Sequence, residues 1–152
     1  MRLTLVAVGR RKAGPEQDLF DQYARRLTWP LTLKLVEAKK GLEGDALKAK
    51  EADLLAAALP AGAVLVAMDE RGKSLGSGDF ARQLGAWRDG GQRDIAFIIG
   101  GADGLDDSLR KRADLVLSLG RQTWPHQLVP ALLAEQLYRT QCILAGHPYH
   151  RA

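Results

Sequence analysis

Short apolar runs alternate with longer amphipathic stretches along the whole chain, and this alternation limits the folds open to it. The apolar runs are expected to form five strands, at residues 3–8, 31–35, 63–68, 95–99 and 115–119. The amphipathic stretches are expected to form helices at 15–27, 45–59, 106–113 and 125–145, with a further helix that Ser77 caps. Because strands separated by helices pair in parallel, the pattern predicts an α/β fold with a mainly parallel sheet and helices on both faces.

The 152 residues are expected to form one domain, 1–152. Hydrophobic residues make up 46% of the chain, which excludes a mainly disordered protein. The single cysteine excludes a disulfide framework and a zinc ribbon. No apolar run approaches the roughly 18–20 residues of a membrane span, and the N-terminal run lacks a signal-peptide cleavage site. We therefore expect a cytoplasmic protein that makes no membrane contact.

Positive charge is concentrated near the N-terminus. The whole chain carries a net charge of +4, whereas residues 1–40 hold nine Lys and Arg against four acids and so carry +5. This basic lobe is compatible with a polyanionic partner, or simply with a solvated surface.

Ligands of parallel sheets bind beyond the carboxyl ends of the strands, so the loops that follow strands are the expected site. Residues 67–74 resemble a relaxed phosphate-binding loop, which leaves a small nucleotide hydrolase as one alternative. Asp69 and Glu70 argue against it, because carboxylates repel phosphates. The glycines of segment 100–104 either form a tight turn or let the backbone approach a ligand closely.

The last third of the chain concentrates polar residues. Glu135 and Arg139 lie four residues apart and share a helix face, as a surface ion pair or as part of a polar site. Pro130 must kink the predicted helix or mark its true start. The candidate metal ligands in this region are His126, Cys142, His147 and His150. No acidic cluster accompanies them, and we expect no metal.

Several segments together resemble a known family. They are Leu5 to Gly9, Ile98 to Leu105 (IIGGADGL), Leu117 to Leu119, Thr123 to Gln127 (TWPHQ), Leu132 to Arg139 (LLAEQLYR) and His147 to His150 (HPYH). In this order, and over essentially the full length, they resemble the ribosomal RNA large subunit methyltransferase H family of the SPOUT superfamily.

The resemblance implies an α/β fold with a SPOUT-type C-terminal trefoil knot and a homodimer whose active site lies at the subunit interface. It implies that S-adenosylmethionine is the methyl donor. The implied reaction is methylation of N3 of a pseudouridine in helix 69 of 23S rRNA, within the assembled ribosome.

The resemblance also implies the site residues. Those expected to bind the cofactor are Met68, Gly100, Leu119, Gly120, Arg121, Gln122, Thr123 and Trp124. Those expected to be catalytic are Glu135, Arg139, Tyr149 and His150. Tyr149 and His150 would orient the base or help to remove its proton, Arg139 would stabilise negative charge on the pyrimidine oxygens, and Glu135 would hold Arg139. His126 is either structural or functional.

One position departs from the family pattern, since Pro130 stands where relatives often carry Arg. An RNA phosphate contact is lost there, and Arg10, Arg11, Lys12, Arg25 and Arg26 could supply contacts instead. A further alternative is an RNA-binding or ribosome-associated factor that uses the basic lobe and is not an enzyme. Binding of S-adenosylmethionine separates it from the methyltransferase.

Overall fold

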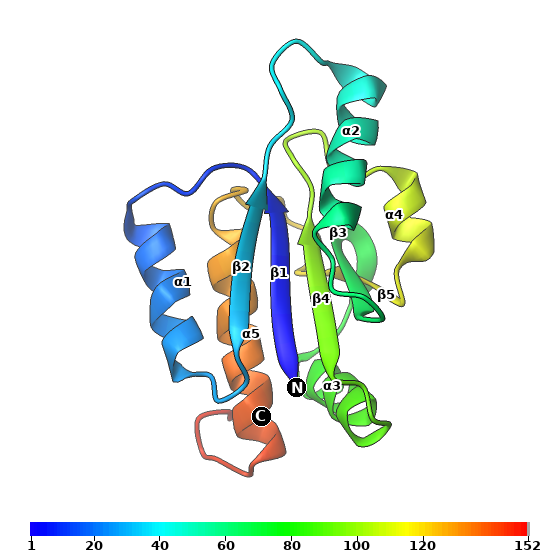
Figure 1. The fold of residues 1–152 in the computed structure, drawn as a ribbon. Helices are drawn as coiled ribbons and strands as arrows, with labels where there is room; N and C mark the ends of the chain where they lie inside the picture. The colour runs from blue at the N-terminus through cyan, green and yellow to red at the C-terminus, as the bar shows by residue number, and fades with distance from the viewer. Residues whose placement is uncertain (152) are drawn as a thin grey trace.

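The computed structural model describes residues 1–151. Its strands are β1 (Arg2–Val8), β2 (Leu31–Val36), β3 (Val64–Ser74), β4 (Asp94–Ile99) and β5 (Leu115–Ser118). Its helices are α1 (Pro15–Arg26), α2 (Gly44–Ala57), α3 (Ser77–Asp89), α4 (Asp107–Arg112) and α5 (Val129–Leu144). The strands form one parallel sheet in the order β2-β1-β4-β3-β5 (Figure 1). The predicted α/β fold with a parallel sheet is confirmed.

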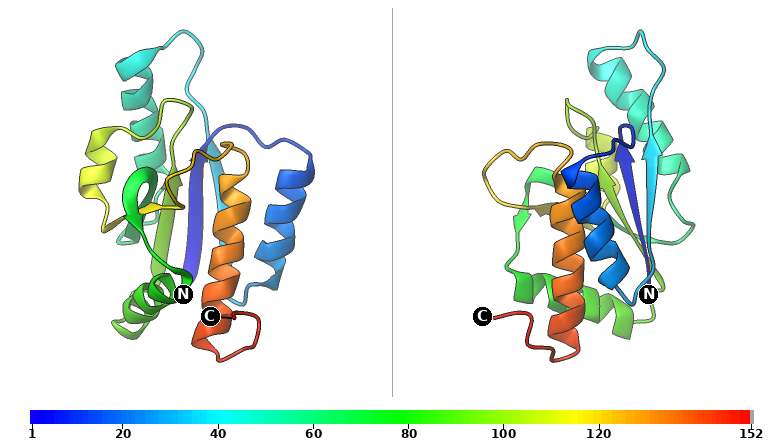
Figure 2. Two further views of the ribbon diagram at one scale, coloured as in Figure 1. Left: turned by 180° about the vertical axis from the view of Figure 1, so that it is seen from behind. Right: turned by 90° about the vertical axis from the view of Figure 1, so that its left-hand side faces the viewer.

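Alternation along the central strands creates one apolar core on each face of the sheet. In β1, Leu3 and Leu5 point to a core shared with α1, α3 and α5, while Val6 and Val8 point to a core shared with α2 and α4. Figure 2 shows the two layers of helices from behind and from the side. Because β1, β4 and β3 are covered on both faces, their buried stretches at residues 5–8, 95–99 and 64–68 are continuously apolar, as is usual in parallel sheets.

The predicted end of the third strand at Met68 is wrong. Met68 pairs with Leu117, residues 69–72 bulge outwards, and β3 then resumes pairing, with Lys73 opposite Leu117. A Cβ on Gly72 would lie 2.5 Å from the Val116 carbonyl oxygen, so only glycine allows the strand to rejoin its neighbour here. Lys73 therefore lies inside a strand and not at the start of a helix, which removes the basis for a phosphate-binding loop.

Two predicted helix starts are also wrong. The N-cap of α3 is Gly76 without a side-chain cap bond, because the hydroxyl of Ser77 instead donates to Gln136 Oε1 at 2.7 Å. Helix α5 begins at Val129 and not at Pro125. Pro130 lies in its first turn, where its missing N–H costs no helical hydrogen bond, so this proline marks the start of the helix and does not kink it.

None of the helices in residues 1–151 is long and apolar enough to cross a membrane. The trefoil knot that the resemblance implies stays a prediction.

Candidate active site

A cavity of about 570 Å³ opens at the carboxyl edge of the sheet. Its walls come from the bulge of β3, the loop after β4 and the loop that joins β5 to α5. Seven of the eight residues predicted to bind the cofactor line it: Met68, Gly100, Leu119, Gly120, Gln122, Thr123 and Trp124. Arg121 is exposed and does not line the cavity. The structure thus brings together segments that are up to 56 residues apart in the chain.

The loop after β4 turns so tightly that glycine is required at its start. A Cβ on Gly100 would lie 2.7 Å from the carbonyl carbon and oxygen of Gly104. The turn is closed by the Gly104 N–H, which donates to the Gly101 oxygen at 3.0 Å, and Gly104 itself has φ of +84°. A clash with the turn therefore explains Gly100, and the positive φ explains Gly104. The same turn forms one wall of the cavity.

Short contacts also hold the loop between β5 and α5. The Gly120 N–H donates to Ser118 Oγ at 3.1 Å, and that hydroxyl donates to the Gly120 oxygen at 2.7 Å. The indole N–H of Trp124 donates to the Leu119 oxygen at 3.3 Å, although the side chain stays 39% exposed. This arrangement places an aromatic ring at the mouth of the cavity.

His126 ties the same loop to the end of β1. Its Nε2 lies 2.8 Å from the Val8 carbonyl oxygen. A carbonyl only accepts, so Nε2 carries a proton and donates. This hydrogen bond supports a structural role for His126, which also lines the cavity.

Glu51 is a residue that the sequence analysis missed. It lies on α2 with only 8% of its surface exposed, and its carboxylate lies beside Gly101 in the cavity wall. Burial raises the pKa of Glu51 and the charge of Asp103 raises it further, while His126 opposes this. A signal was present, because Glu51 lies four residues after Leu47 and four before Leu55, on the apolar face of the helix.

Asp69 lies in the bulge of β3 and is held by arginines. Its Oδ1 accepts from the backbone N–H of Arg71 at 2.8 Å and from Arg71 Nε at 3.1 Å, and Arg110 Nε lies 3.7 Å from Oδ2. Burial alone would raise the pKa of Asp69, but the hydrogen bonds from Arg71 and the charges of Arg71 and Arg110 lower it overall. Asp69 is therefore an ionised carboxylate at the cavity.

The four residues predicted to be catalytic form one hydrogen-bonded cluster. Glu135 Oε1 accepts from Arg139 Nη2 at 2.6 Å and from the hydroxyl of Tyr149 at 2.9 Å. Arg139 Nη1 lies 3.2 Å from His150 Nδ1. Because a guanidinium only donates, Nδ1 accepts and the neutral imidazole keeps its proton on Nε2. The cluster joins the middle of α5 to the C-terminal tail.

Burial raises the pKa of the Tyr149 hydroxyl, and hydrogen bonding with Tyr23 and Glu135 raises it further. The hydroxyl therefore stays protonated at neutral pH and donates to Glu135. Its oxygen retains lone pairs that can accept a hydrogen bond from a substrate.

A second cavity of about 500 Å³ connects the two groups of residues. Leu119, Gly120 and Trp124 line it on one side, and Glu135 and Gln136 of α5 line it on the other. Arg139, Tyr149 and His150 do not line this cavity. The tail follows the far end of α5, away from the carboxyl edge of the sheet (Figure 2).

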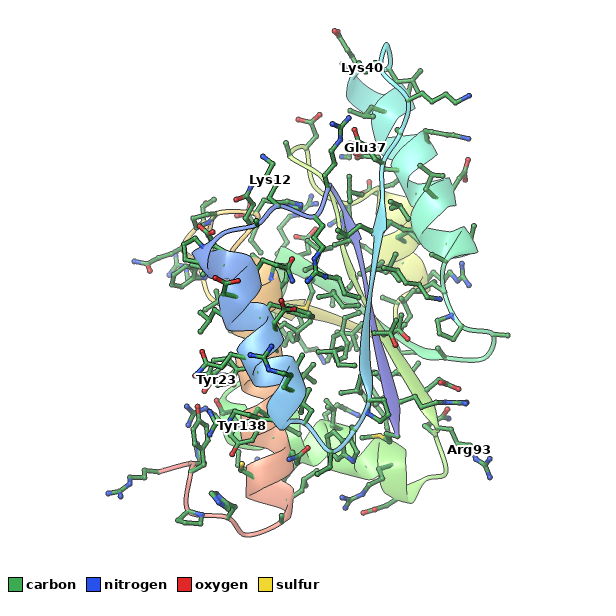
Figure 3. All side chains as sticks on the ribbon, turned by 60° about the vertical axis from the view of Figure 1, so that its left-hand side comes forward. Lys12, Tyr23, Glu37, Lys40, Arg93 and Tyr138 are labelled. Carbon is green, nitrogen blue, oxygen red and sulfur yellow. The ribbon has the colours of Figure 1, made fainter. Side chains whose placement is uncertain are left out.

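The arginines proposed from the sequence as phosphate contacts are mostly engaged within the protein. Arg10 donates to both carboxylate oxygens of Glu37, at 2.6 and 2.9 Å, and Arg11 donates to Asp21 at 3.2 Å. Lys12 forms no side-chain hydrogen bond or ion pair within residues 1–151, and Figure 3 shows it at the same end of the molecule as Lys40.

Comparison with known proteins identifies the class of this molecule. Residues 1–150 match the family described as "Predicted SPOUT methyltransferase", and the chain belongs to this family. Ribosomal RNA large subunit methyltransferase H of Rhodospirillum centenum is 64% identical over 152 residues, which cover 100% of both chains.

Solved structures agree with this fold. A probable methylase family protein of Haemophilus influenzae aligns with a TM-score of 0.59 at 11% identity, over 99% of this chain and 70% of that chain. A Legionella pneumophila protein described as a "putative methyltransferase", solved in complex with the bound cofactor SAM, aligns with a TM-score of 0.50 at 15% identity, over 91% of this chain and 66% of that chain.

Proposed function

We propose that this protein transfers a methyl group from S-adenosylmethionine to N3 of a pseudouridine in helix 69 of 23S rRNA, in the assembled ribosome. The name of the relative that is 64% identical supports ribosomal RNA as the substrate. The observation that carries the proposal is the cavity that Trp124 and Glu135 share, because it places Glu135, one member of the polar cluster, opposite the predicted cofactor loops.

The cavity at the carboxyl edge fits S-adenosylmethionine in size and character. Apolar side chains of Met68, Ile99 and Leu117 line it beside free backbone groups of the glycine turns, which suits an adenine base. Three acids (Asp69, Glu70 and Asp103) and two bases (Lys48 and Arg71) also line it, so the lining carries a net negative charge that favours a cation over a triphosphate. When bound, S-adenosylmethionine supplies a methyl group on a positively charged sulfur. The SAM-bound Legionella pneumophila methyltransferase of similar fold supports this choice of cofactor.

In the proposed reaction, Tyr149 and Glu135 together remove the proton from N3. The Tyr149 oxygen accepts the N3 proton while the Tyr149 hydroxyl proton passes to Glu135 Oε1, 2.9 Å away. Bound S-adenosylmethionine would supply the methyl group to the electron pair that deprotonation leaves on N3, and the pair of its carbon–sulfur bond would stay on sulfur. Arg139 stabilises the negative charge that develops on the pyrimidine oxygens, and His150 Nε2–H donates to the base.

We further propose that the whole chain, 1–152, acts as a single domain within a homodimer in the cytoplasm, where ribosomes lie. The half-exposed Trp124 and the apolar part of the second cavity, with Leu75, Leu119 and Leu132, leave apolar surface for a second copy to cover. A second copy would also bring another C-terminal tail to the cofactor loops. Analytical ultracentrifugation tests this, and a monomer at micromolar concentration would exclude it.

The decisive experiment uses ribosomes from cells that lack this protein. Purified protein and methyl-labelled S-adenosylmethionine are added, and nucleoside mass spectrometry locates the label. The expected product is N3-methylpseudouridine in 23S rRNA. Cofactor binding without label would move the substrate elsewhere, with Pro130 as the first position to revert to Arg. If the rRNA carries no label and the protein also binds no cofactor, the result would favour an RNA-binding factor.

A further inference from the structure

Three tyrosine rings surround the guanidinium of Arg26, which is the last residue of α1. Its Cζ lies 4.1 Å from the ring centroid of Tyr138, 5.5 Å from that of Tyr149 and 5.6 Å from that of Tyr23. Its Nη2 also donates to the Tyr138 hydroxyl at 3.2 Å. These distances lie within the range of cation–π attraction. Figure 3 shows Tyr23 and Tyr138 side by side where α1 faces α5.

This cluster connects the tail to two helices. Tyr138 and Tyr149 meet edge to face, with centroids 4.8 Å apart and an interplanar angle of 78°. On α1, Tyr23 lies 6.2 Å from Tyr138, ring to ring. Arg139 Cζ lies 4.8 Å from the Tyr149 centroid, so two guanidinium groups and one aromatic edge restrict the Tyr149 ring. The ring position in turn sets where the hydroxyl meets Glu135.

We propose that Arg26 is a positioning residue that holds Tyr149 through the cluster of tyrosine rings and so fixes the Tyr149 hydroxyl on Glu135. The inference rests on the proposed function, because the catalytic effect of Arg26 requires that Tyr149 accepts the N3 proton. It replaces the sequence-based hypothesis that Arg26 contacts RNA phosphate. A planar guanidinium stacks on rings in a way that an ammonium group does not, so this role needs arginine and a phosphate contact does not.

The test compares Arg26→Ala and Arg26→Lys with Arg112→Ala. Arg112 ends α4 as Arg26 ends α1, is exposed, and has no side-chain hydrogen bond or ion pair within residues 1–151. Hydrogen–deuterium exchange of the tail, residues 145–151, is followed for each variant without cofactor or ribosomes. Single-turnover methylation, KM for ribosomes and the salt dependence of ribosome binding are then measured for each variant.

Both Arg26 variants are expected to exchange faster in the tail and to lose about 10- to 100-fold in single-turnover rate, with little change in KM or salt dependence. The Arg112 variant should match the wild type. A raised KM and a flatter salt dependence in Arg26→Ala, both restored in Arg26→Lys, would overturn the proposal in favour of a phosphate contact. Tail exchange equal to the wild type in both Arg26 variants would also overturn it.

The exchange measurement separates this inference from the proposed function. If the wild type methylates no ribosomal RNA but the tail still loosens in both Arg26 variants, the positioning of Tyr149 stands and the assigned reaction fails. If methylation is normal in the wild type and in both variants, the reaction stands and the positioning role fails.

Discussion

The carboxylate of Glu51 fills the space that a side chain on Gly101 would occupy. A Cβ at position 101 would lie 2.7 Å from Glu51 Oε2. Helix α2 and the loop after β4 thus meet through one buried carboxylate and one missing side chain. No side-chain hydrogen bond or ion pair engages that carboxylate within residues 1–151. The pairing couples the charge state of Glu51 to the wall of the candidate cofactor cavity.

Replacing Glu51 with Gln should change how stability depends on pH. Because the pKa of Glu51 is raised in the folded state, the folded protein holds this proton more tightly than the unfolded chain. The wild type therefore loses stability as pH rises from the ordinary glutamate value through the folded one. At pH 7, Glu51→Gln should be more stable than the wild type by about 1 kcal/mol, and the gain should vanish near pH 4.

Urea unfolding followed by circular dichroism at both pH values measures this difference. Asp53→Asn is the matched control, since Asp53 is exposed on the same helix and should show no such difference between the two pH values. An advantage of Glu51→Gln that is the same at pH 4 and pH 7 would contradict the assignment.

Alanine at Gly100 should damage both folding and cofactor binding. The new Cβ meets backbone of Gly104 and Leu105, at 2.7 and 2.9 Å, and a backbone clash is relieved only by moving the loop. We expect a loss of about 1–3 kcal/mol in unfolding free energy. Calorimetric titration with S-adenosylmethionine should show at least a tenfold weaker Kd.

Gly101→Ala should do less harm, because its Cβ meets only the end of the flexible Glu51 side chain. Gly78→Ala is the control, since nothing lies within 4 Å of a Cβ there and the residue is in α3. Equal losses in all three variants would mean that steric demand in the turn is not the cause.

Removing the Tyr149 hydroxyl should impair catalysis without affecting cofactor binding. Tyr149→Phe loses the hydrogen bond to Glu135, which is about 1 kcal/mol of stability, and it loses the proposed path for the N3 proton. We expect the single-turnover rate to fall by about 100-fold or more with Kd for S-adenosylmethionine unchanged. An unchanged rate would exclude Tyr149 from proton transfer.

Lysines at the carboxyl end of the sheet should dominate the salt dependence of ribosome binding. Lys12 and Lys40 form no side-chain ion pair within the described chain, whereas Glu37 already neutralises Arg10. Lys12→Ala combined with Lys40→Ala should flatten the slope of log affinity against log salt by about 1–2. The double variant Arg93→Ala with Arg112→Ala removes the same charge from exposed side chains that form no ion pair within the described residues and precede β4 and β5, at the amino end of the sheet, and it should change the slope less. Equal slopes for the two double variants would reject a specific basic surface.

Much of the fold followed from local pattern. The strands at 3–8 and 95–99 and the helix at 15–27 agree with the structure to within a residue, because apolar periodicity over five to twelve residues is a local property. The starts of α3 and α5 and the continuation of β3 past its bulge did not follow. The capping of α3 and the path of β3 depend on Gln136 and Val116, which lie 59 and 44 residues from Ser77 and Gly72.

The candidate site divides in the same way. The sequence by itself determined which loops follow strands, and through the resemblance it indicated the residues for a cofactor and for catalysis. Only the tertiary structure decided that the Glu51 carboxylate packs against Gly101 and that Glu37 forms an ion pair with Arg10. It also decided that the Arg26 guanidinium packs against the ring of Tyr149, which is 123 residues away in the chain. Spacing along one helix or strand fixes which side chains share a face, whereas the partner of that face is chosen by the packing of the whole sheet.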